Sequence, residues 1–242
     1  MKKHIPNIIT GFNAVSGCIA IYLAFNNELV LAAAFIFLGA IFDFLDGFSA
    51  RLLNAYSNIG KEMDSLADVI SFGFAPTAIA YSLLSTIENK TIMDLVNGDL
   101  SAFIILIPFV MVIFSALRLA KFNLDERQTS SFIGMPTPSN ALLWASLPLA
   151  ATYGNIDFIQ LITNSSSFII FMSIFMSYLL VAEIPMFSFK IKSLKPKENI
   201  PQFSFIVILI GMFVGLRISA FAFIIPVYIL ISLLNNLFGK KK

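Results

Sequence analysis

The sequence has little of what a water-soluble protein needs. Of its 242 residues, 12% are charged and 58% are hydrophobic, and the mean hydropathy is +0.86. This composition excludes an ordinary water-soluble globule of the same length. The single cysteine, Cys18, excludes an intramolecular disulfide and a thiolate metal cluster. No polar stretch is long enough to fold as a separate domain, so the function must come from the membrane-embedded part.

Apolar runs fill most of the chain. A transmembrane helix needs about 20 such residues, and the runs lie near 8–25, 29–50, 68–87, 101–122, 138–154, 166–189, 202–216 and 218–238. We therefore predict an all-α integral membrane protein with about eight transmembrane helices, forming a single membrane domain over residues 1–242. The last two runs are separated only near Leu216 and Arg217, which fits either a tight hairpin or one re-entrant element followed by a span.

Basic residues gather on one side of this arrangement. With both termini in the cytoplasm, only Lys90 and Arg217 fall outside. The residues that fall inside are Lys2, Lys3, Arg51, Lys61, Arg118, Lys121, Arg127, Lys190, Lys192, Lys195, Lys197, Lys240, Lys241 and Lys242. Cytoplasmic loops are rich in lysine and arginine, so we predict a multi-pass protein of the cell (inner) membrane with both termini cytoplasmic. A cleaved signal peptide is the alternative for the basic start, but polar residues interrupt the first apolar run.

Four aspartates stand close together in the stretch FDFLDGFSARLLNAYSNIGKEMDSLADVISFGFAP. Asp43 and Asp46 are three residues apart, and Asp64 and Asp68 are four apart, so each pair projects from one face of its own helix. A short loop, roughly residues 52–60, folds one pair back against the other. We therefore expect the four carboxylates to converge at the cytoplasmic surface of the membrane.

Clustered carboxylates beside hydrocarbon are costly unless something cancels their charge. Ordinary pairing with Arg51 and Lys61 is one alternative, but two cations cannot neutralise four anions. Oxygen ligands without histidine or cysteine suit a hard divalent ion, and four carboxylates can hold two such ions. The sequence therefore predicts a site for two Mg²⁺ or Mn²⁺ ions, an arrangement that binds and polarises a diphosphate.

Small residues stand between the acids, where a ligand needs room. Gly47 and Ala50 follow the first pair and Gly60 precedes the second, so a ligand can approach the backbone closely. Arg51 adds a planar guanidinium that suits a phosphate group.

The spacing of these residues resembles a family signature. Written D-x2-D-G-x2-A-R-x8-G-x3-D-x3-D, the pattern of the CDP-alcohol phosphotransferases is matched by Asp43, Asp46, Gly47, Ala50, Arg51, Gly60, Asp64 and Asp68. The resemblance implies a six-helix core, usually dimeric, that binds a CDP-linked lipid at the cytoplasmic face. Such enzymes transfer the phosphatidyl or equivalent group to an alcohol and release CMP. We assign the core to about residues 1–189 and an additional helix pair to about 202–238.

The resemblance also implies roles for individual residues. Asp43 and Asp64 would bridge two metals, Asp46 would complete one metal shell, and Asp68 would ligate the other metal and act as general base. The near-terminal PNIIT and a hydroxyl seven residues before Asp64 extend the nucleotide site. The CDP-binding set is then Asn7, Thr10, Asp46, Gly47, Ala50, Arg51, Ser57 and Gly60. Polar capping of the first helix is the alternative role for the first two of these residues.

A second stretch bears on the acceptor alcohol. LRLAKFNLDERQTSSFIGMPTP resembles the R-x-A-[RK]-F-N and F-x-G-[LM]-P-x-P segments of membrane-integral bacterial phosphatidylserine synthases. Serine carries a carboxylate, which needs a cation, and we predict acceptor binding by Arg118, Lys121 and Asn123. The alternative for the basic residues is anchoring at the cytoplasmic boundary.

Together these features predict transfer of the phosphatidyl group from CDP-diacylglycerol to L-serine. Membrane lipids and a second copy of the chain, forming a homodimer, are the other expected partners, and no nucleic acid is expected. The same chemistry with glycerol 3-phosphate or inositol phosphate remains an alternative. A divalent-cation transporter is the alternative from another class, because intramembrane acids also mark ion pathways.

Overall fold

The computed structural model describes residues 4–124, 132–187 and 199–238. Part of the predicted cytoplasmic basic set lies outside these ranges: Lys2, Lys3, Arg127, Lys190, Lys192, Lys195, Lys197, Lys240, Lys241 and Lys242.

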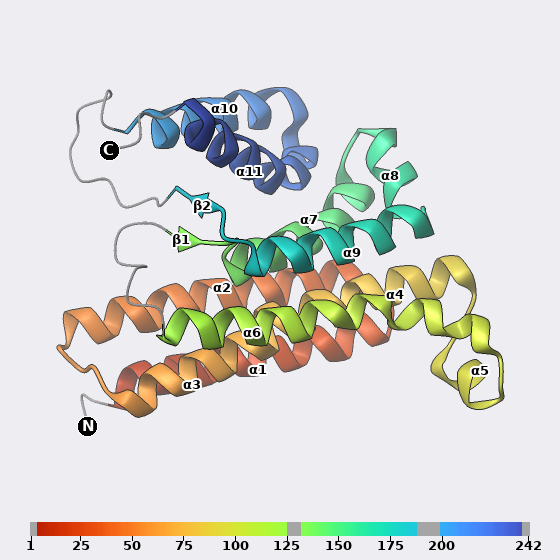
Figure 1. Cartoon of the computed structure of the whole chain (residues 1–242), viewed down its shortest axis with the longest axis horizontal. Helices are drawn as coiled ribbons and strands as arrows, with labels where there is room; N and C mark the ends of the chain where they lie inside the picture. Colours follow the sequence, from red (N-terminus) through yellow and green to blue (C-terminus); the bar gives the residue numbers. More distant parts are fainter. Residues whose placement is uncertain (1–3, 125–131, 188–198, 239–242) are drawn as a thin grey trace.

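The described part of the chain is helical apart from one short β ribbon (Figure 1). Its α-helices are α1 (Ile5–Phe25), α2 (Leu29–Leu52), α3 (Asn58–Asp68), α4 (Ala75–Glu88), α5 (Ile92–Val96), α6 (Val110–Leu124), α7 (Thr137–Tyr153), α8 (Asp157–Thr163), α9 (Ser166–Val181), α10 (Ile200–Leu216) and α11 (Phe221–Phe238). A π-helical turn spans Val69–Phe74, 3₁₀ segments span Leu100–Phe109 and Arg217–Ala220, and the strands are β1 (Phe132–Ile133) and β2 (Pro185–Met186).

The long helices lie roughly parallel in layers. Figure 1 shows α1, α2, α3, α4 and α6 in one bundle, with α7 and α9 on one face of it and the pair α10–α11 beyond them. In agreement, α1 contacts α2, α3 and α4, while α7 contacts both α2 and α11. The all-α membrane fold expected from the sequence is confirmed.

Small residues bring the first helices together. Ala20 and Ala24 of α1 pack with Ala32 and Ala33 of α2, and all four are fully buried. In a bilayer, close packing replaces the hydrophobic effect between helices, so alanine-rich contacts of this kind are favourable. The first two helices therefore form a tight platform for the residues at their ends.

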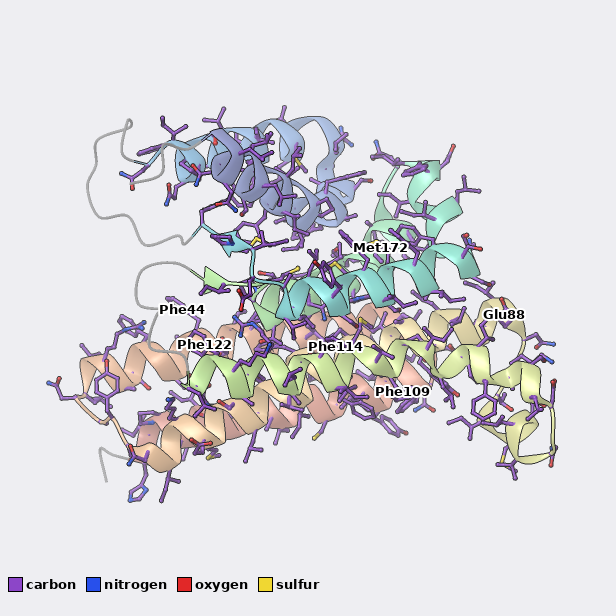
Figure 2. All side chains as sticks on the ribbon, viewed as in Figure 1. Phe44, Glu88, Phe109, Phe114, Phe122 and Met172 are labelled. Atoms are coloured by element: carbon purple, nitrogen blue, oxygen red, sulfur yellow. The ribbon has the colours of Figure 1, made fainter. Side chains whose placement is uncertain are left out.

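Large apolar side chains cover the outside of the bundle. Phe44, Ile113, Val207 and Val214 are among those that are mainly exposed. Figure 2 shows side chains of this kind projecting from the ribbon over most of the length of the helices. A soluble monomer rarely exposes such continuous apolar surface, whereas hydrocarbon solvates it.

Five helical stretches of the described chain are long and apolar enough to span a membrane. They are Ile5–Phe25, Leu29–Leu52, Asn58–Glu88, Leu100–Leu124 and Ile200–Leu237, and α8 with α9 gives a sixth if this pair, bent by 80°, is one span. Each of the eight predicted apolar runs contains a helix in the described ranges. The number of spans is five or six because α7 has only 17 residues and Ile200–Leu237 is counted as one helical stretch.

The last two helices form a hairpin. Arg217, between α10 and α11, has a φ of 51° and a ψ of −124°, which reverses the chain. Phe213 and Phe221 on either side of the reversal pack edge to face, with ring centroids 5.2 Å apart. Of the two arrangements left open by the sequence, the structure has the hairpin.

One predicted boundary differs clearly from the structure. The run 166–189 was expected to be one helix, but α9 ends at Val181 and the chain becomes extended at Ala182, with ψ at 139°. Pro185, which follows shortly, disfavours helix in the residue before it and cannot donate a helical hydrogen bond. The segment released from the helix becomes β2, which pairs antiparallel with β1.

Candidate active site

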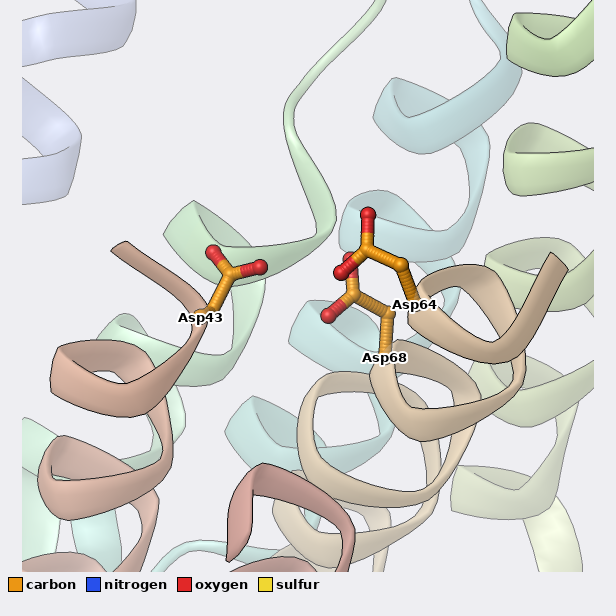
Figure 3. Close-up of side chains that lie close together, drawn as sticks. All are labelled: Asp43, Asp64 and Asp68. Carbon is orange, nitrogen blue, oxygen red and sulfur yellow. The ribbon is translucent and has the colours of Figure 1, made fainter. Parts of the chain in front are cut away.

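Three of the four predicted aspartates converge. Asp43 comes from α2, and Asp64 and Asp68 come from consecutive turns of α3 (Figure 3). One carboxylate oxygen of each lies within 4.8 Å of the others. The short connection between Leu52 and Asn58 returns the chain, as the sequence predicted, and α3 packs on α1, which also contacts α2. This arrangement brings the acids of α2 and α3 together.

Asp46 is placed differently from the other three. Asp46 lies three residues after Asp43 on α2, so the two side chains share one broad face but point about 60° apart around the helix axis. The Asp46 carboxylate Oδ2 accepts a hydrogen bond of 2.6 Å from the hydroxyl of Thr10 on α1. Among the described residues Asp46 is not part of the tight group of three, and its role as a metal ligand stays a prediction.

The three clustered carboxylates have few partners of their own. Asp64 Oδ1 is buried without a hydrogen-bond partner among the described residues. Asp68 is 8% exposed, and its Oδ1 accepts one hydrogen bond, of 3.3 Å, from Asn13 Nδ2. Within the described part of the chain the only salt bridge joins Lys90 to Asp99. Pairing of the acids with local cations, the alternative considered above, is therefore absent from the described ranges.

The donor set of this cluster fits a divalent cation. It consists of carboxylate oxygens alone, which suits Mg²⁺ or Mn²⁺ better than a soft metal. Buried polar atoms almost always have partners, so the unpartnered oxygen of Asp64 marks a position where a cation would be stabilising. Asp43, Asp64 and Asp68 are the residues that could hold it.

A pocket of about 240 Å³ adjoins the cluster and shares Asp64 with it. All eight residues predicted to bind the nucleotide line this pocket: Asn7, Thr10, Asp46, Gly47, Ala50, Arg51, Ser57 and Gly60. Its other lining residues are Pro6, Ala55, Tyr56 and Lys61. We call it the donor pocket, after the CDP-linked lipid that the sequence predicts as the donor of the transferred group. It is built by α1, the end of α2 and the start of α3.

Two of these residues shape the entrance to α3. The Ser57 hydroxyl accepts a hydrogen bond of 3.0 Å from the backbone N–H of Gly60, which caps the helix. A Cβ at Gly60 would lie 2.9 Å from Ser57 Oγ and 3.0 Å from Asn7 Oδ1. Glycine at this position therefore keeps α1 and α3 close beside the donor pocket.

Asn13 is a site residue that the sequence analysis did not assign. Asn7, Thr10 and Asn13 follow one another at intervals of three on α1, so they lie near one face of the helix. That face meets Gly60, Asp46 and Asp68 respectively. The sequence does carry a signal for Asn13: polar residues recur at every third position in an otherwise apolar helix.

The structure separates the three predicted acceptor residues. Arg118 is 6% exposed, and its charge interacts with that of Asp68. Lys121 is exposed on the same helix. The Asn123 amide donates a hydrogen bond of 2.9 Å to Ser65 Oγ and so ties α6 to α3. Of the three, Arg118 is the one that is buried, with its charge near that of Asp68.

Arg118 is held by the segment that leads into α7. Its Nε donates a hydrogen bond of 2.8 Å to the carbonyl of Met135, and its Nη1 donates one of 3.3 Å to Thr137 Oγ1. Its guanidinium also lies 5.4 Å from the centroid of the Phe122 ring. These contacts fix the side chain but leave further N–H donors of the guanidinium for a ligand.

An apolar pocket of about 400 Å³ lies elsewhere, between α7, α8, α9 and α11. Met172 of α9, labelled in Figure 2, lines it together with Leu147, Phe168, Phe223 and Leu230. Its walls are almost entirely hydrocarbon.

Comparison with known proteins identifies a family and several relatives. A sequence model of the CDP-alcohol phosphatidyltransferase family matches residues 3–232. The CDP-diacylglycerol–serine O-phosphatidyltransferase of Bacillus subtilis is 40% identical over 138 residues, which cover 56% of this chain and 70% of that protein. The protein of the same name from Helicobacter pylori is 30% identical over 235 residues, covering 96% of this chain and 91% of that protein. The archaetidylserine synthase of Methanothermobacter thermautotrophicus is 32% identical over 155 residues, covering 63% and 61% respectively.

Proposed function

The chain belongs to the CDP-alcohol phosphatidyltransferase family, and we infer that it transfers the phosphatidyl group of CDP-diacylglycerol to the hydroxyl of L-serine. The products are phosphatidylserine and CMP, so the protein is a phospholipid-synthesising transferase. The observation that carries this inference is the aspartate cluster on α2 and α3, which adjoins a pocket lined by the whole predicted nucleotide set.

The metal centre belongs to the proposal. Asp43, Asp64 and Asp68 would hold a divalent ion, Mg²⁺ or Mn²⁺, and Asp46 would complete the shell of a second ion. Bound ions of this kind polarise the diphosphate and stabilise charge on the attacking and leaving oxygens. Support comes from the all-oxygen donor set and from the unpartnered Oδ1 of Asp64.

Asp68 is the residue that we assign as general base. Asn13 already binds its Oδ1, which leaves Oδ2 to take the proton of the serine hydroxyl. The serine oxygen then forms a bond to the phosphorus that carries the diacylglycerol. The bond between that phosphorus and the CMP oxygen breaks, and CMP leaves with the electron pair.

The donor pocket would bind the CDP group. Arg51 and Lys61 bring positive charge to this pocket, and Thr10 fixes the orientation of Asp46. Gly47 and Ala50 have little or no side chain, so a phosphate group can approach the backbone of α2 closely. The acyl chains of the donor would remain between the helices, in contact with membrane lipid.

Arg118 is the residue to which we assign the serine carboxylate. It combines a buried cation, a fixed geometry and an electrostatic interaction with Asp68. Arginine pairs with carboxylates through two parallel hydrogen bonds, which also orient the ligand. Serine held in this way would present its hydroxyl toward the base.

We also propose the placement of the protein in the cell. The ends of α2 and α6 that carry Arg51, Arg118 and Lys121 lie at the same end of the bundle as the aspartates, and Lys90 follows α4 at the opposite end (Figure 1). By the positive-inside rule, the active site and both termini would face the cytoplasm at the inner membrane. A homodimer is the assembly that we expect.

The test uses the purified full-length protein. With CDP-diacylglycerol, Mg²⁺ or Mn²⁺ and labelled serine, we expect labelled phosphatidylserine and an equal amount of CMP. Parallel reactions with labelled glycerol 3-phosphate and inositol phosphate should give no lipid product. Asp68→Asn should abolish turnover while much of the CDP-diacylglycerol binding remains. Efficient transfer to a phosphorylated alcohol, with none to serine, would replace this function with another of the same family.

A further inference from the structure

The C-terminal hairpin is bound to the ribbon strand β2 by side-chain hydrogen bonds. The Tyr228 hydroxyl on α11 donates to the carbonyl of Phe187 at 3.0 Å. Two turns further along the same helix, Asn236 Nδ2 donates to the carbonyl of Pro185 at 2.6 Å. The Tyr228 ring also packs on the ring of Phe187, with centroids 4.8 Å apart. One face of α11 therefore holds the backbone of β2 and of the residue that follows it.

The β1–β2 ribbon connects β2 to the segment before α7. β2 pairs with β1, with Phe132 opposite Met186 and Ile133 opposite Pro185. Beyond β1, the backbone N–H of Gly134 donates to the carbonyl of Ile184 at 2.9 Å. Gly134 has a φ of +77°, and a Cβ there would lie 2.7 Å from the carbonyl oxygen of Leu180, so the close approach requires glycine.

Met135 is the point where the ribbon meets the site. Its side chain is fully buried in the same apolar cluster as Met186, Phe187 and Tyr228. Its backbone N–H donates to the carbonyl of Leu179 at 2.9 Å, so the peptide cannot rotate freely. Its carbonyl accepts the 2.8 Å hydrogen bond from Arg118 Nε. The chain of contacts from α11 thus ends on the guanidinium.

The Tyr228 hydroxyl is bound to the Phe187 carbonyl, so Tyr228 reaches Arg118 through the ribbon and Met135. Residues of α11 do not line the donor pocket, whose described lining lies between Pro6 and Asp64. The influence of the hairpin is therefore confined to the side of the site that holds Arg118.

We propose that the α10–α11 hairpin positions the acceptor-binding arginine, and that Tyr228 and Asn236 are the positioning residues through which it does so. The proposal rests on the function assigned to Arg118 above. The hairpin fixes the backbone of β2, the ribbon fixes Met135, and Met135 fixes the direction of the Arg118 guanidinium. Serine binding, rather than donor binding, depends on this arrangement.

The experiment compares the KM values for serine and for CDP-diacylglycerol in full-length variants. Tyr228→Phe removes only the hydroxyl and keeps the ring contacts, and Asn236→Leu removes the second bond. Loss of the buried Tyr228 hydrogen bond should raise the KM for serine about threefold to tenfold. Loss of the exposed Asn236 bond should raise it in the same direction by a smaller factor. The KM for CDP-diacylglycerol should stay within about twofold of the wild-type value, because the donor pocket is untouched. Tyr178→Phe, at an exposed tyrosine of α9, is the matched control and should leave both KM values unchanged.

A double-mutant cycle tests whether Tyr228 acts through Arg118. If it does, the effects of Tyr228→Phe and Arg118→Lys on the KM for serine should be clearly less than additive. Equal rises in both KM values, or a lower thermal midpoint with unchanged KM values, would reduce the hairpin to a structural support and overturn the proposal. The assay of the wild-type enzyme with serine and the other alcohols tests the proposed function independently of these variants. Should the enzyme use another alcohol, the same ratios would be measured for that alcohol.

Discussion

Thr10 and Asp46 are 36 residues apart in the sequence, and a 2.6 Å hydrogen bond joins their side chains across α1 and α2. The bond turns the Asp46 carboxylate toward the donor pocket, which both residues line. Asp46 therefore stands at the boundary between the pocket and the metal cluster.

Thr10→Val should weaken donor binding. Valine keeps the shape of threonine and removes the hydroxyl, and a hydrogen bond to a charged group is worth about 1.5–3 kcal/mol. We expect the KM for CDP-diacylglycerol to rise about tenfold or more, with the KM for serine little changed. Thr163→Val is the control, because the Thr163 hydroxyl bonds only to backbone carbonyls of its own helix. Similar kinetics for both variants would remove Thr10 from the pocket's function.

Gly17→Ala should separate α1 from the turn that follows Asp68. A Cβ at Gly17 would lie 2.7 Å from the Cα of Ser71, in the π-helical turn, and backbone cannot move aside as a side chain can. Overpacking of this kind costs about 1–3 kcal/mol, and we expect a lower thermal midpoint together with reduced turnover. Gly211→Ala, where a Cβ would meet no atom within 4 Å, should leave both quantities unchanged. An unaffected Gly17→Ala variant would show that the two helices are not in such close contact.

Divalent ions should stabilise the folded protein. Ligand at a hundred times its dissociation constant contributes about 2.7 kcal/mol to the free energy of unfolding, and three clustered carboxylates without a cation repel one another. We expect Mg²⁺ or Mn²⁺ to raise the thermal midpoint in detergent and a chelator to reverse the rise. Asp64→Asn should lose most of this response, whereas Asp157→Asn, at an exposed acid on α8, should keep it. An equal response in both variants would place the ion elsewhere.

The loop after α4 should contribute stability that is constant near neutral pH. The hydrogen bond from Lys90 lowers the pKa of the Asp99 carboxyl to about 2, with further help from Ser101, and the same bond to Asp99 raises the pKa of Lys90. A lowered carboxyl pKa stabilises the fold above the ordinary aspartate range, and this contribution is lost as the pH falls toward 2. A raised lysine pKa gives a contribution that is lost only above the ordinary value of 10.5.

Thermal midpoints of the wild type and Asp99→Asn test this expectation. Their difference should be constant from about pH 5 to pH 9 and should shrink toward lower pH. Because the side chains of the pair are partly exposed, added salt should also reduce the difference. A difference that varies between pH 5 and pH 9 would mean that another group in the loop titrates with Asp99.

The central part of the site could be predicted because it depends on local spacing. Two carboxylates three or four residues apart on a helix share a face whatever surrounds them, and the short loop before Asn58 keeps the start of α3 close to the end of α2. The donor pocket could be predicted for the same reason, since its lining residues lie on these two helices and on α1, which contacts both.

Other features depend on contacts that spacing does not reveal. The bond between Asn13 and Asp68 crosses 55 residues and requires the register of α1 against α3. The strands β1 and β2 have two residues each, too few to show an alternating pattern. The distance between Asp46 and the other three acids depends on the exact angle of α2, which is set by packing against α1 and α7.

The donor pocket is drawn from one continuous stretch, Pro6 to Asp64, while Arg118 and its supports come from α6, the ribbon and α11. In the proposed function, the two substrates of the reaction would therefore be bound by different parts of the chain. A related enzyme could then evolve to use another alcohol through substitutions beyond α4 alone, while the donor pocket stayed unchanged.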